Sequence, residues 1–182
     1  DKVCIISGGA GSIGLAVAQK FLAEGAKVML LDLVQGALDR AVATCQSDRV
    51  AARVVDVIDS HQVKSAFEDT VARWGKLDVV VSNAGNAGRN ERVQDYPEDI
   101  FDQTLMVHAK GAFLACKHAA PLMNEGGSII ITSSVSGVRG GNGVNMAYVT
   151  AKHAQIGVMR VAAKALAARG IRVNTINPGP VD

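Results

Sequence analysis

Ser7-Gly8-Gly9-Ala10-Gly11-Ser12-Ile13-Gly14 joins a short apolar run to a longer segment of helical period. Glycines let the backbone approach a ligand closely, and the amides at the start of the following helix attract phosphate. A final glycine also lets such a helix pack tightly on a sheet. A plain tight turn would explain the glycines, but not their position between a strand and a helix. The segment therefore predicts a phosphate-binding loop.

The rest of the chain repeats this order of a strand followed by a helix. Short runs rich in valine and isoleucine alternate with longer segments of helical period, which is typical of βαβ units and a parallel sheet. Most strand positions are apolar, so helices should cover both faces of the sheet. We expect an α/β fold, a Rossmann-like doubly wound parallel sheet, in a single domain over residues 1–182. Expected strands are 2–7, 27–32, 50–56, 77–83, 127–133 and 171–177, and expected helices are 13–24, 36–46, 60–74, 98–123 with a break near His108, and 148–168.

Composition narrows the function classes. Hydrophobic residues make up 48% and charged residues 20% of the 182 positions, as in an ordinary globular protein. The net charge of +2, with scattered cations, gives no reason to expect a nucleic-acid partner. The sequence contains neither a membrane-length apolar run nor a signal peptide, so we expect a cytoplasmic protein. Cys4, Cys45 and Cys116 are too widely spaced to predict a metal site.

The second expected strand ends in an acidic residue, Asp32. In a dinucleotide-binding fold, a carboxylate at this place accepts hydrogen bonds from the adenosine ribose hydroxyls. A 2'-phosphate would meet a like charge there. Asp32 therefore predicts NAD rather than NADP, and the alternative is a solvated turn residue.

Tyr148 and Lys152 stand four residues apart in Tyr148-Val149-Thr150-Ala151-Lys152, and hence on one face of a helix. A nearby ammonium favours the phenolate form of a phenol and so helps it to exchange a proton near neutral pH. We expect Tyr148 to be the general acid/base. An exposed helix can carry such a pair by chance, so the assignment depends on the surrounding motifs.

In combination, these motifs resemble the classical short-chain dehydrogenase/reductase family from the first strand to the last residue. The family's Thr-Gly-x-x-x-Gly-x-Gly element corresponds to positions 7–14, with Ser12 at the middle glycine. The resemblance implies that NAD is bound by Gly8, Gly11, Ser12, Ile13, Gly14, Asp32, Asp56, Val57, Asn83, Ala84, Gly85, Tyr148, Lys152, Pro178 and Gly179. Within this set, Asp56 and Val57 would contact the adenine. Asp56 and Asn83 could instead be simple turn residues.

The same resemblance implies the chemistry. A hydride would pass between nicotinamide and an alcohol or carbonyl substrate, Tyr148 would exchange the proton, and Lys152 would also hold the nicotinamide ribose. The family's serine falls within Thr132-Ser133-Ser134, and we assign it to Ser134, with Ser133 and Ser136 as possible substitutes. The spacing from Ser134 to Tyr148 is one residue longer than is usual in the family, which implies an insertion within 137–143.

One position departs from the family pattern. The family has an Asn-x-x-Gly helix segment whose asparagine anchors a water in the proton relay, and here the segment is Val107-His108-Ala109-Lys110-Gly111. Imidazole can hold a water or relay a proton itself. We hypothesise that His108 takes over this catalytic role. The alternative is a buried histidine bonded to the backbone.

Two other functions stay open. One is a NAD-binding sensor or scaffold without chemistry, and the other is an isomerase or dehydratase that recycles tightly bound NAD. The resemblance also implies a homo-oligomer, a tetramer or dimer. Because the sequence stops just after the sixth expected strand, we expect the last strand and the substrate lid of the family to be missing. The sequence therefore does not identify the substrate.

Overall fold

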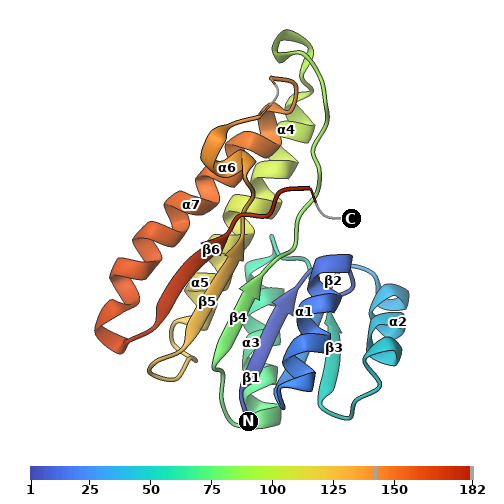
Figure 1. Ribbon diagram of the computed structural model, residues 1–182, viewed down its shortest axis with the longest axis vertical. Coiled ribbons are helices and arrows are strands. Elements are labelled where there is room, and N and C mark those ends of the chain that lie inside the picture. The colour runs from blue at the N-terminus through green and yellow to red at the C-terminus, as the bar shows by residue number, and fades with distance from the viewer. Residues whose placement is uncertain (142, 181–182) are drawn as a thin grey trace.

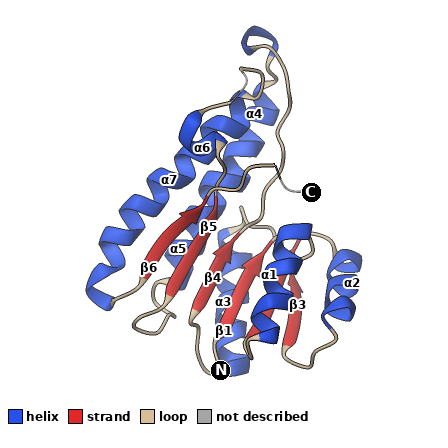
Figure 2. Cartoon of the chain, in the orientation of Figure 1, coloured by secondary structure: helices blue, strands red, loops and turns tan. Residues whose placement is uncertain are grey.

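The computed structural model describes residues 1–141 and 143–180. Six parallel strands form one sheet in the order β3-β2-β1-β4-β5-β6, with helices packed against it (Figures 1 and 2). The strands are β1 (Val3–Ser7), β2 (Lys27–Asp32), β3 (Val50–Val54), β4 (Val79–Ser82), β5 (Ser128–Thr132) and β6 (Arg172–Ile176). The predicted doubly wound α/β fold is confirmed.

Within the described residues, seven α-helices lie between the strands: α1 (Ser12–Ala23), α2 (Gln35–Cys45), α3 (Ser60–Trp74), α4 (Glu98–Leu105), α5 (Gly111–Ala119), α6 (Ser136–Arg139) and α7 (Met146–Leu166). The other helical turns of these ranges are the 3₁₀-helices η1 (Val93–Asp95) and η3 (Ala167–Arg169) and the π-helix η2 (Met106–Lys110). No helix within the described ranges is both long and apolar enough to cross a membrane.

Two hydrophobic cores lie on opposite faces of the sheet because successive strand side chains point to opposite sides. On β1, Ile5 belongs to the core that contains α3, α5 and α7, whereas its neighbour Ile6 belongs to the core that contains α1 and α2. Figure 1 shows α1 in front of the sheet and α3 behind it. The nearly continuous apolar strands of the sequence are therefore explained by burial on both faces.

The predicted helix 98–123 is in fact three elements. The break expected near His108 is the π-helix η2, and α5 ends at Ala119. The guanidinium of Arg169, which comes much later in the chain, donates hydrogen bonds to the carbonyls of Ala120 and Met123 just beyond that end. Pro121, two residues beyond Ala119, is a local helix-ending signal that the sequence prediction did not use, so the end of the helix was expected too late.

The order of the strands creates a crevice at the carboxyl edge of the sheet. The chain builds outward from β1 to β3 and then returns to place β4 on the other side of β1. In open α/β sheets, ligands bind at this switch point, outside the carboxyl ends of the strands. Here the Ser7 hydroxyl, at the end of β1, accepts hydrogen bonds from the Asn83 and Ala84 amides after β4, at 3.0 and 3.2 Å. These bonds hold the two sides of the crevice together.

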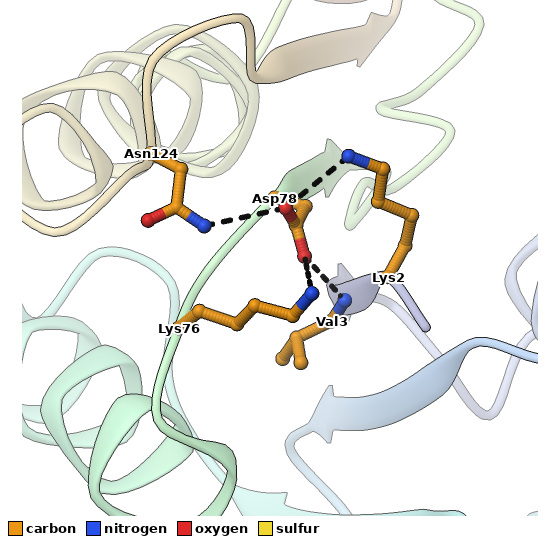
Figure 3. Close-up of polar contacts among 5 residues, drawn as sticks. All are labelled: Lys2, Val3, Lys76, Asp78 and Asn124. Atoms are coloured by element: carbon orange, nitrogen blue, oxygen red, sulfur yellow. Dashed lines mark hydrogen bonds and ion pairs between the residues drawn. The ribbon is translucent and has the colours of Figure 1, made fainter.

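At the amino ends of the strands, the buried carboxylate of Asp78 connects the starts of β1 and β4 (Figure 3). Asp78 accepts a 2.8 Å hydrogen bond from the Val3 amide and one from Asn124, and its carboxylate forms ion pairs with Lys2 and Lys76. Burial alone would raise the pKa of Asp78, but these hydrogen bonds and cations outweigh it and lower the pKa below its usual value.

We expect Asp78→Asn to lower the free energy of unfolding by about 1–3 kcal/mol at pH 7, because the charged hydrogen bonds of a buried group are lost. A lowered folded-state pKa stabilises the protein above the unfolded value and loses that effect as the pH falls through the folded value. The difference from the wild type should therefore shrink below about pH 4. Urea unfolding measures this difference in the free energy of unfolding at each pH, with Asp48→Asn, at an exposed side chain, as the control. A gap that is equal at pH 7 and pH 3 would contradict this prediction.

Candidate functional site

A cavity of about 940 Å³ opens at the carboxyl edge of the sheet, around the switch point. Every residue predicted to bind the cofactor lines it except Gly14, and the four predicted catalytic residues line it as well. Segments scattered from Gly8 to Gly179 thus meet in one space. Among the predicted alternatives to Ser134, Ser133 lines the cavity, whereas Ser136 is not among its lining residues.

The phosphate-binding loop predicted at residues 7–14, called the glycine loop from here on, depends on its glycines for its backbone conformation. Gly8 has φ +63°, and a side chain there would come within 2.9 Å of Ala84 Cα across the crevice. Gly14 lies behind the loop, where an added Cβ would lie 2.2 Å from the Gly8 carbonyl oxygen. Its role is therefore to let α1 approach the loop closely rather than to face the cavity. Gly11 is the N-cap of α1, and no side chain of the described residues caps that helix end.

Asp32 ends β2 and faces the cavity beside the glycine loop. One carboxylate oxygen accepts a 3.0 Å hydrogen bond from the Ala10 amide and the other a 2.8 Å bond from the Leu33 amide. These amides fix the orientation of the carboxylate. An ionised carboxylate has about four lone-pair sites, so it retains acceptor capacity for a ligand.

Tyr148 and Lys152 lie one turn apart at the start of α7, as the sequence predicts. The Lys152 Nζ lies 5.3 Å from the centre of the Tyr148 ring and donates a 2.8 Å hydrogen bond to the Thr132 carbonyl at the end of β5. Burial lowers the pKa of Lys152 to about 8. The ammonium is therefore still the main form at pH 7, held between the sheet and the phenol.

The two neighbouring serines after β5 differ in what they bind. The Ser133 hydroxyl donates a 2.9 Å hydrogen bond to the backbone carbonyl of Lys152, and it is buried. The Ser134 hydroxyl instead accepts a 3.1 Å hydrogen bond from the Ser136 amide, which leaves its own proton free to be donated. Of the three serines, Ser134 is therefore the one that lines the cavity without donating its hydroxyl proton to the backbone.

His108 lies in the π-helix η2, and its ring meets the ring of Tyr148 edge to face, with 5.6 Å between centres. Its Nε2 is 2.9 Å from the Asn86 carbonyl, while the buried Nδ1 has no hydrogen-bond partner among the described residues. Burial and, to a lesser extent, the nearby Lys152 ammonium together lower the pKa of His108 to about 4, against the opposing effect of the hydrogen bond to Asn86. The imidazole is thus neutral at pH 7.

Three polar residues of the cavity wall were not predicted from the sequence. Asn86 and Gln103 lie on the segment after β4 and on α4, and Asn145 is the N-cap of α7, where it accepts a hydrogen bond from the Tyr148 amide. Asparagine is a favoured N-cap residue, so its place three residues before Tyr148 was a usable signal. The others are brought to the cavity only by the path of the chain.

Comparison with known proteins agrees with this fold. A family model described as enoyl-(acyl carrier protein) reductase matches residues 8–182. (+)-cis,cis-Nepetalactol synthase NEPS3 of Nepeta racemosa is 42% identical over 183 residues, which cover 97% of this chain and 67% of that protein. Levodione reductase of Leifsonia aquatica is 34% identical over 187 residues, which cover 100% of this chain and 70% of that protein.

Solved structures show the same likeness. A crystal structure of levodione reductase, 34% identical, has a TM-score of 0.93 and covers 98% of this chain and 71% of that chain. A crystal structure of NAD⁺-bound xylitol dehydrogenase, 39% identical, has a TM-score of 0.91 and covers 98% of this chain and 70% of that chain. The family model spans nearly the whole sequence, and both relatives exceed 30% identity. The chain therefore belongs to the short-chain dehydrogenase/reductase family.

Proposed function

We propose that this protein is an oxidoreductase that uses NAD to move a hydride between nicotinamide and a secondary alcohol or ketone. The observation that carries the proposal is the placing of Tyr148 and Lys152 side by side in the cavity onto which the glycine loop opens. The NAD⁺ bound to xylitol dehydrogenase, a relative in both sequence and fold, supports the choice of cofactor. A cytoplasmic homo-oligomer, with one domain over residues 1–182, stays a prediction.

The residues of the cavity fit a dinucleotide. The crowded backbone at Gly8 and Gly14 forms a cradle that a single Cβ would fill, and the uncapped start of α1 can bind a pyrophosphate through its amides. Asp32 has acceptor capacity for the adenosine ribose hydroxyls and would repel a 2'-phosphate. We assign the adenine to Asp56 and Val57. We assign the nicotinamide half to Asn83, Ala84, Gly85, Lys152, Pro178 and Gly179.

The side chains around the substrate oxygen would bind that oxygen and exchange its proton. NAD, when bound, supplies the hydride acceptor or donor. Ser134 would donate a hydrogen bond to the substrate oxygen and hold it beside the phenol of Tyr148. Tyr148 would take the hydroxyl proton during oxidation and return it during reduction, and the Lys152 ammonium would favour the phenolate that this exchange requires.

A screen for reduction of NAD tests the proposal. Sugars, polyols, steroids and hydroxyacyl thioesters are offered as substrates, and the absorbance of NADH is followed. We expect turnover with at least one secondary alcohol and a higher kcat/KM with NAD than with NADP, because of the carboxylate at Asp32. Binding of NADH without turnover of any substrate would favour a sensor or scaffold instead.

A non-redox reaction is the second candidate, because one relative at 42% identity is named a synthase rather than a dehydrogenase. An isomerase or dehydratase of this kind would keep NAD tightly bound and show no net reduction of it. The NAD screen therefore includes product analysis by mass spectrometry. A converted substrate without accumulated NADH would favour this second candidate.

His108 is proposed to support the proton exchange through its neutral, buried Nδ1, which can accept a hydrogen bond from a water. We expect His108→Leu to lower kcat by about 10²-fold and to alter its pH profile, since a proton-transfer group is removed. His108→Asn, which restores a polar side chain, should recover much of the loss. Turnover of both variants is measured from pH 5 to pH 10. An unchanged profile in His108→Leu would leave His108 as a buried histidine that only anchors Asn86.

A further inference from the structure

One amide connects two walls of the cavity. Asn145, at the N-cap of α7, accepts a 3.3 Å hydrogen bond from the Tyr148 amide through Oδ1 and donates a 2.8 Å bond to the Ala87 carbonyl through Nδ2. The first bond belongs to the helix that carries Tyr148. The second reaches the segment that follows β4, residues 86–97, which we call the rim segment. Asn145, Ala87 and Tyr148 all line the cavity.

Further contacts join the rim segment to the start of α7. The Tyr96 hydroxyl lies 3.5 Å from Asn145 Oδ1 and accepts a 3.1 Å hydrogen bond from the Arg89 amide. The Glu91 amide donates a 2.7 Å bond to the Val144 carbonyl. Figure 1 shows the segment after β4 rising past the sheet toward the loop that precedes α7. Asn145 is the residue at which these contacts meet the helix.

We infer that Asn145 is a positioning residue that sets the distance between the rim segment and the Tyr148 hydroxyl, and with it the fit of the substrate. This inference rests on the proposed function, in which the substrate oxygen lies beside Tyr148. Both halves of the amide are needed, because Oδ1 accepts from the helix and Nδ2 donates to the rim segment. A helix cap alone would need only the acceptor.

The change from amide to carboxylate separates these two roles. Asn145→Asp keeps an oxygen for the Tyr148 amide, since aspartate caps helices as well as asparagine does. It loses the donor to Ala87 and places a negative charge against that carbonyl. We expect the KM for the alcohol to rise about tenfold, as for the loss of one hydrogen bond together with the new repulsion, while kcat and the Kd for NADH change less than threefold. Asn145→Ala should show the same KM effect together with a lower Tm.

Hydrogen exchange read by mass spectrometry tests the connection without any substrate. In the whole protein, Asn145→Asp should speed exchange in residues 86–97 and leave the first turn of α7 unchanged. Asn90→Asp is the matched control, because it adds the same charge to the rim segment at an exposed side chain. Wild-type exchange in Asn145→Asp would overturn the inference, and so would faster exchange with an unchanged KM. Failure of the proposed function appears separately, as activity that survives Tyr148→Phe.

Discussion

Tyr148→Phe is expected to lower kcat by about 10²- to 10⁴-fold, the range for removal of a general acid or base. The phenylalanine keeps the ring that packs edge to face on His108 and lies beside the Lys152 ammonium. The substitution removes only the hydroxyl that would exchange the proton. Binding of NADH should therefore stay within about threefold of the wild-type affinity, less than the tenfold that about 1.4 kcal/mol would give.

Two measurements on the same preparation check this prediction. Steady-state turnover of the best alcohol from the screen gives kcat, and quenching of protein fluorescence by NADH gives Kd. A variant that binds NADH normally and has lost turnover fits the assignment. A kcat within tenfold of the wild type would show that another group exchanges the proton, with Ser134 and His108 the nearest alternatives by geometry.

Gly14→Ala is expected to have the second large effect, because its new methyl group would lie 2.2 Å from the Gly8 carbonyl oxygen. Either α1 or the glycine loop has to move. Overpacking of this kind costs about 1–3 kcal/mol, so both the stability and the affinity for NADH should fall, the affinity by about 10- to 100-fold. Urea unfolding and NADH titration measure the two effects.

Gly157→Ala is the matched control for this substitution. Gly157 lies inside α7, and apart from its chain neighbours and the adjacent backbone of the helix, none of the described atoms comes within 4 Å of the Cβ that the substitution adds. Alanine is a better helix former than glycine, so this variant should be more stable by roughly 0.5–1 kcal/mol and bind NADH normally. Unchanged NADH affinity in Gly14→Ala would mean that the loop adapts and that close packing at Gly14 is not required for the cofactor.

Local sequence signals predicted some elements to the residue. α3 begins and ends at Ser60 and Trp74, as expected, because the Asp59 side chain caps its first amides and Gly75 ends it with φ +80°. β2 also has its predicted bounds, Lys27 and Asp32. Where the residues that begin or end an element lie next to it in the sequence, the sequence alone predicts its bounds.

Sequence reasoning missed a helical turn too short to show a period, and it missed contacts between distant segments. α6 is a single turn in a glycine-rich stretch and has no helical period to detect. The insertion predicted within 137–143 falls partly on this turn, and position 142 lies outside the described residues. The partner of His108 was also missed, because Asn86 reaches it across 22 positions of the chain. Gly14, one of the expected cofactor-binding residues, does not line the cavity, and its close packing against Gly8 agrees with the helix-packing role that the sequence also predicted for it.

The end of β5 and the start of α7 exchange a reciprocal pair of hydrogen bonds: the Lys152 ammonium binds the Thr132 carbonyl, and the Ser133 hydroxyl binds the Lys152 carbonyl. These two hydrogen bonds fix the end of β5 relative to the start of α7, and with them the positions of Ser134 and Tyr148. Neither of these two hydrogen bonds involves residues 87–97. Exchange of residues 87–97 between homologues, with Asn86 kept as the partner of His108, is therefore a route to new substrate preferences that leaves the attachment of Ser134 to Tyr148 in place.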